Sequence, residues 1–126
     1  MLELMQNLSW VAVIAGTVTA FVAGWIWYSP LLFGDQWADG LDVHMGNRMP
    51  IVPMVCQVAG LFLLSLFVGV SIDVSALVIL ILGALAYLLL GFSGESFAGH
   101  PMAVRLINAG YWVLALMVLV LVHALI

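Results

Sequence analysis

The stretch Gly24-Trp-Ile-Trp-Tyr-Ser-Pro-Leu-Leu-Phe-Gly34 decides the fold of this chain, because a long apolar helix ends within it. It contains three amphipathic aromatic residues, Trp25, Trp27 and Tyr28. Each of them has an apolar ring and one polar atom, which suits the headgroup depth of a membrane. Pro30 disfavours helical geometry at Ser29, directly after the aromatic residues. The stretch therefore predicts the exit of a transmembrane helix at a membrane interface.

Composition predicts an integral membrane protein. Of the 126 residues, 67% are hydrophobic and 6% are charged, whereas soluble domains carry about 25% charged residues. Four separate apolar stretches are each long enough to cross ~30 Å of hydrocarbon. We predict an all-α integral membrane four-helix bundle in a single domain, 1–126, with helices at about 8–28, 51–71, 74–92 and 102–126. The amino-terminal residues lack the features of a cleaved signal peptide, so we expect the first helix to remain.

The few charged residues limit the classes of partner. The chain has six acidic side chains and two arginines, Arg48 and Arg105. Two basic side chains cannot form a basic patch that would bind nucleic acid or anionic lipid headgroups. Cys56 is the single cysteine, so it cannot form an intrachain disulfide. By the positive-inside rule, the two arginines predict that loops 29–50 and 93–101 are cytoplasmic.

Small residues form a regular stripe on the first helix. They recur every four positions, at Ala12, Gly16, Ala20 and Gly24. Side chains at this spacing share one helix face, and small ones let a second helix approach closely. The partner helix can come from the same chain or from another copy, and the sequence favours neither.

After Pro30, residues 31–42 predict a short interfacial helix. Its apolar residues are four apart, at Phe33, Trp37 and Leu41, and its acidic residues fall elsewhere on the helical wheel, at Asp35, Asp39 and Asp42. An acidic polar face lacks the usual attraction to anionic lipid. We therefore expect this helix to pack on the bundle.

Polar side chains in the apolar helices and in the loop 93–101 are the candidates for a pathway or gate, because polar groups are costly at membrane depth unless they pair or face water. The candidates are Arg105, Glu95, Asn108, Gln57 and His100. Each also has a simpler interpretation. Asn and Gln often only bridge helices, and an exposed Glu95–Arg105 ion pair would contribute about 0–1 kcal/mol.

Metal binding and catalysis receive little support from the sequence. The residues His44, Met45, Met49 and Cys56 are soft ligands that could suit Cu(I). Their spacing matches no known motif, and seven methionines make such a run common in an apolar chain. The chain also lacks the metalloprotease, nucleophile-elbow and phosphate-loop motifs. We expect no metal, no cofactor and no enzymatic activity.

Two sequence blocks resemble a known family. Residues 24–34 with Trp37, and residues 106–112 with the upstream segment 99–101, are similar to the signature blocks of a mostly bacterial family of small membrane proteins, domain-of-unknown-function family seventeen-sixty-one. The resemblance implies four transmembrane helices and a bacterial inner membrane, and the family's name assigns no activity. The family typically has lysine where this chain has Asp35, and more basic residues near His100. A role that needs a cation at those points is not expected here.

Two functional hypotheses follow. One is a small-solute or ion permeation unit, in which a homo-oligomer encloses a path near Gln57, Asn108 and Arg105. The other is an accessory or assembly subunit that packs against a larger membrane complex. We favour permeation, because polar and aromatic residues gather at one end of the bundle, whereas a packing subunit needs only small-residue stripes. Membrane lipid is a partner under either hypothesis.

Overall fold

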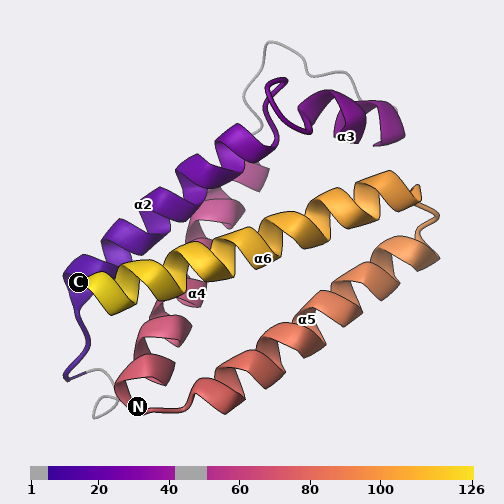
Figure 1. Cartoon of the computed structure of the whole chain (residues 1–126). Helices are drawn as coiled ribbons and strands as arrows, with labels where there is room; N and C mark the ends of the chain where they lie inside the picture. Colours follow the sequence, from indigo (N-terminus) through magenta and orange to yellow (C-terminus); the bar gives the residue numbers. More distant parts are fainter. Residues whose placement is uncertain (1–5, 42–50) are drawn as a thin grey trace.

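The computed structural model describes residues 6–41 and 51–126, and the chain is helical in nearly all of them (Figure 1). The helices in these ranges are α2 (Trp10–Trp27), α3 (Gly34–Leu41), α4 (Ile51–Asp73), α5 (Leu77–Phe97) and α6 (Met102–Leu125). Four of the helices in this part of the chain, all but α3, are long and apolar enough to cross a membrane. The predicted all-α membrane bundle with a short helix after the first span is confirmed.

The core of the bundle is formed mainly by α2, α4 and α6. Its buried side chains are Ala20, Leu61, Val68, Leu80, Tyr111, Ala115 and Leu119. Figure 1 shows α6 passing between α2 and α5. Only Leu80 of α5 is buried, so nearly the whole surface of this helix is left for lipid or for another chain.

The stripe of small residues on α2 faces α6 and α4 of the same chain. All four members of the stripe are buried. A Cβ atom added at Gly16 would lie 2.8 Å from Leu119 Cδ2 and 2.9 Å from Ser65 Oγ. The Ser65 hydroxyl donates a hydrogen bond of 2.9 Å to the Val13 carbonyl oxygen, which is possible only because the two backbones approach so closely. The stripe thus serves packing within the chain.

The turn between α4 and α5 differs from the prediction. We expected one helix to end at about residue 71 and the next to begin at residue 74. Instead α4 continues through Asp73, and the chain reverses at Ser75, whose φ is 57°. The Ala76 N–H donates to the Ser71 carbonyl oxygen at 2.7 Å. This is the hydrogen-bond pattern of a helix that ends on a left-handed residue.

The carboxyl end of α5 also differs from the prediction. Helix α5 runs to Phe97, so the expected loop 93–101 is wrong and Glu95 is a helical residue. The chain turns away from the helix at Gly99, whose φ of 80° suits a residue without a Cβ. The His100 N–H closes the end with a bond of 3.0 Å to the Glu95 carbonyl oxygen. Pro101 precedes α6 as its N-cap.

Helix α3 lies on α6, as its acidic polar face led us to expect. It begins later than predicted, because residues 29–32 form a turn in which the Leu32 N–H donates to the Ser29 carbonyl oxygen at 3.1 Å. A Cβ atom on Gly40 would meet the Val104 side chain of α6. Asp42, the predicted last residue of this helix, lies outside the described residues.

The exposed rings of Trp10 and Trp25 should report the two interfaces of the membrane. They are 47% and 63% exposed and are separated by about 22 Å along α2 at ~1.5 Å per residue. The fluorescence of each ring is the difference between the wild-type protein and the variant that lacks the ring, Trp10→Phe or Trp25→Phe. In bilayers of brominated lipids, we expect bromines near the headgroups to quench this fluorescence most strongly. Strongest quenching of either ring by bromines at the bilayer centre would contradict a straight crossing by α2.

Candidate functional site

A cavity of about 700 Å³ lies at the end of the bundle where α2 and α5 end and α4 and α6 begin. We call it the mouth cavity. Its lining residues are Phe21, Gly24, Trp25, Tyr28, Ser29, Pro30, Trp37, Pro53, Met54, Gln57, Glu95, Asn108, Tyr111 and Trp112. Six of these residues are aromatic, and Glu95 is the only one that carries a charge. The cavity therefore combines an aromatic wall with one carboxyl group.

The amide of Asn108 ties three segments to α6 at this cavity. Its Oδ1 atom accepts hydrogen bonds from the Tyr28 hydroxyl at 2.6 Å and from Trp37 Nε1 at 3.0 Å. Its Nδ2 atom donates to Glu95 Oε1 on α5. Three of the four hydrogen bonds that an amide side chain can make are thus used. Burial raises the pKa of Tyr28, with Tyr111 and Glu95 acting in the same direction, so its hydroxyl remains a donor.

Tyr111 makes the matching connection between α2, α4 and α6. Its ring is buried, and its hydroxyl donates to the Ala20 carbonyl oxygen at 3.1 Å and accepts from Gln57 Nε2 at 3.1 Å. The ring fits against α2 because position 24 is glycine. A Cβ atom there would lie 2.7 Å from the Tyr111 hydroxyl oxygen and 2.8 Å from Cζ.

Trp27 fixes the last turn of α2 to α6. Its Nε1 atom donates to the Ile107 carbonyl oxygen at 3.0 Å, and its ring covers Gly110, where a Cβ atom would lie 2.8 Å from Cζ2. We expected the polar atoms of Trp27 and Tyr28 to face headgroups, but both bond to α6 instead. Trp25, which is mostly exposed, keeps the outward position predicted for all three.

The two signature blocks are therefore two halves of one contact. Gly24 faces Tyr111, Trp27 faces Gly110, and Tyr28 bonds to Asn108. Sequence reasoning did not select Tyr111 as a site residue, because a tyrosine in an apolar helix is also common as a plain core or interface residue. The signal that could have found it is complementary size, since each block pairs large aromatic residues with a glycine.

The predicted pathway residues divide into two groups. Gln57, Glu95 and Asn108 all line the mouth cavity, whereas Arg105 and His100 do not. Arg105 Nη1 donates to Ser96 Oγ at 2.8 Å, and its guanidinium lies 5.1 Å from the centre of the Phe92 ring. The ion pair between Arg105 and Glu95 is not formed. Because α5 stays helical through Phe97, Ser96 rather than Glu95 is presented to Arg105.

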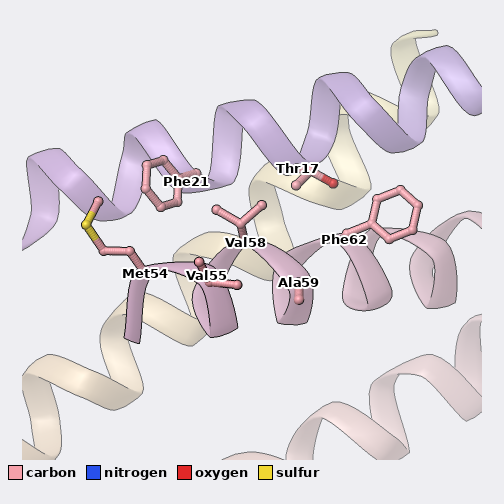
Figure 2. A pocket seen from close by; sticks show the side chains of 7 residues that line it. All are labelled: Thr17, Phe21, Met54, Val55, Val58, Ala59 and Phe62. Carbon is pink, nitrogen blue, oxygen red and sulfur yellow. The ribbon is translucent and has the colours of Figure 1, made fainter. Parts of the chain in front are cut away.

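A second hollow, of about 520 Å³, runs between α2 and α4. Figure 2 shows its lining side chains, Thr17, Phe21, Met54, Val55, Val58, Ala59 and Phe62. The Thr17 hydroxyl donates to the Val13 carbonyl oxygen at 2.8 Å, so the only polar side chain among them is already bonded to its own helix. We call this hollow the apolar groove. It shares Phe21 and Met54 with the mouth cavity, so the two are neighbours.

Of the four residues considered as soft metal ligands, one lies in the described part of the chain. His44, Met45 and Met49 lie outside the described residues, and Cys56 is exposed on α4. Within residues 6–41 and 51–126, no group of three His, Cys, Asp or Glu side chains could hold a metal ion.

The chain belongs to the family described as "Protein of unknown function (DUF1761)", which it matches over residues 11–124. The resemblance carried by the two signature blocks is thereby confirmed. No curated protein and no solved structure matches the chain.

Proposed function

We propose that the protein is a permeation unit for a small solute, with the mouth cavity as the site at which the solute is taken up. The observation that carries the proposal is the convergence of Gln57, Glu95 and Asn108 from three different helices on one cavity. Polar groups are costly in hydrocarbon and are found where they pair or line a path. These three do both, since each is hydrogen-bonded and each lines the cavity.

A path through the membrane requires more than one copy of the chain. Beyond the mouth cavity, the space between α2, α4 and α6 is filled by fully buried side chains such as Leu61, Ala115 and Leu119. A solute that leaves the cavity therefore has to move along an outer surface of the bundle. A second copy packed against that surface would shield the solute from lipid, and α5 offers the largest unburied helix surface for it.

Met54→Trp should slow permeation severalfold. The indole ring is larger than the methionine side chain, so it should narrow the mouth cavity. Met54 lines the cavity, whereas the exposed Val52 does not, so Val52→Trp is the matched control. The measurement is flux into vesicles that contain the purified protein, with a neutral solute, an inorganic ion and an organic cation offered separately. Equal flux for the wild-type protein and both variants, or flux no faster than in empty vesicles, would contradict the proposal.

An accessory or assembly subunit is the second candidate. The exposure of α5 supports it too, since only Leu80 of this helix is buried. The two candidates differ in the mass of the purified protein in mild detergent. Permeation requires an oligomer of this chain, whereas a docking subunit should be a monomer that associates with other membrane proteins and adds no flux to vesicles.

A further inference from the structure

We propose that the ligand of the mouth cavity is an organic ammonium cation with an apolar tail, bound by Glu95 and the surrounding aromatic rings while the tail lies in the apolar groove. This inference rests on the proposed function for its biological meaning, but the binding itself can be tested without transport. The chemistry of the residues that line the cavity identifies the ligand class.

The aromatic wall selects a cation. Ring faces carry negative potential, and a cation within about 6 Å of a ring centre is attracted to it, most strongly by tryptophan. The rings of the mouth cavity include three tryptophans, Trp25, Trp37 and Trp112. Tyr28 lies edge-on to Tyr111 and to Trp37, with ring centres 5.5 Å and 5.4 Å apart. The rings thus form a continuous cluster rather than isolated contacts.

The charge of the mouth cavity also favours a cation as its ligand. Among the lining residues within 6–41 and 51–126, Glu95 alone is charged, and no basic side chain of these ranges forms an ion pair with it. Its Oε1 atom is positioned by Asn108, which is in turn held by Tyr28 and Trp37. A cationic ligand would supply the counter-charge to this partly buried carboxylate, and the attraction is stronger there than in bulk water.

The apolar groove supplies the place for a tail. It adjoins the mouth cavity at Phe21 and Met54, which line both hollows. Figure 2 shows that it continues past Val55 and Val58 to Phe62, and the apolar side chains along it offer no hydrogen bonds. An alkyl chain attached to a cation at Glu95 would lie along these side chains and make dispersion contacts with them. A small inorganic cation would leave the groove unused.

Binding can be measured in maltoside micelles by the tryptophan fluorescence of the full chain. The probes are octyltrimethylammonium, octanol and octyl sulfate, which share one chain length and differ in charge. Wild-type protein should bind the cation most tightly and the anion least. Glu95→Gln, which keeps an acceptor for Asn108, should weaken binding of the cation at least tenfold and leave octanol binding unchanged. Asp73→Asn, at the far end of α4, is the matched charge control.

Two further variants keep the test decisive if Glu95→Gln does not fold. Trp25 is mostly exposed, so Trp25→Leu should leave the fold intact and weaken binding of the cation about threefold. Ala59→Trp fills the apolar groove, and it should abolish the advantage of octyltrimethylammonium over tetramethylammonium. Equal affinities for the cation and octanol, or wild-type affinity of folded Glu95→Gln for the cation, would overturn the proposal.

Competition experiments with short-chain lipids should identify the kind of molecule that carries the ammonium group. Displacement of the cation by dihexanoyl phosphatidylcholine, but not by dihexanoyl phosphatidylglycerol, would identify a lipid headgroup as the natural ligand. Failure of both lipids to displace it would identify a free amphiphile, and either result supports the cation site. Selective binding without flux in vesicles would overturn only the proposed permeation, whereas flux without preference for the cation would overturn only this inference.

Discussion

Gly24→Leu should lower the free energy of unfolding by about 3 kcal/mol, the upper end of the usual cost of overpacking. Even a Cβ atom at position 24 would lie within 2.9 Å of three atoms of the Tyr111 side chain. The buried ring would have to move away from α2, and its hydroxyl would lose the Ala20 carbonyl oxygen and Gln57. Reversible unfolding in mixtures of mild detergent and dodecyl sulfate, followed by circular dichroism, measures the change.

Gly60→Leu is the matched control for this substitution. Gly60 also lies within a membrane-spanning helix, but a Cβ atom there meets nothing within 4 Å. The control should change stability little, and the better helix propensity of leucine should act in its favour. Equal stability of the two variants would show that the close approach of α2 to Tyr111 does not stabilise the bundle.

Asn108→Leu should lower the free energy of unfolding by about 2 kcal/mol, because it removes three interhelical hydrogen bonds that average about 0.6 kcal/mol each in membrane proteins. It also leaves the Tyr28 hydroxyl, Trp37 Nε1 and the Glu95 carboxylate without this partner. Removing one side of a hydrogen bond is costly when the other side stays buried. The same unfolding measurement applies, with near-ultraviolet circular dichroism as a report on the aromatic cluster.

Thr19→Val provides the comparison for Asn108. The Thr19 hydroxyl donates to the Ala15 carbonyl oxygen of its own helix at 2.7 Å and faces outward, so its removal breaks no contact between helices. Its effect should stay below about 0.5 kcal/mol, as is usual for a surface substitution. If Asn108→Leu were no more damaging than Thr19→Val, the amide would not be holding the helices together.

The four membrane spans could be predicted because length and hydrophobicity suffice to identify them. The ends of the helices were predicted less well. The third predicted span ended at about residue 92, before Ser93 and Gly94, yet α5 continues through both residues to Phe97. In hydrocarbon the backbone has no water to bond with, so helical hydrogen bonds persist through such residues. The true end is marked by Gly99, the residue with a positive φ.

The candidate site could be predicted only in part. The cost of polar groups in a membrane pointed to Gln57, Glu95 and Asn108, and the structure brings them to one cavity. Which of them pair depends on the rotation of each helix about its axis, and spacing along one helix does not determine that rotation relative to its neighbours. This is why Arg105 was expected beside Glu95 and instead bonds to Ser96.

The contacts between α2 and α6 also bear on how the protein is made. The hydrogen bonds of Trp27, Tyr28 and Tyr111 that join these helices link residues 80 to 91 positions apart. Helix α2 therefore reaches the membrane long before its main partner has been synthesised. Insertion of the individual helices and their assembly are separate stages in membrane proteins. For this chain the second stage waits for α6, so the core cannot close before this helix has been synthesised.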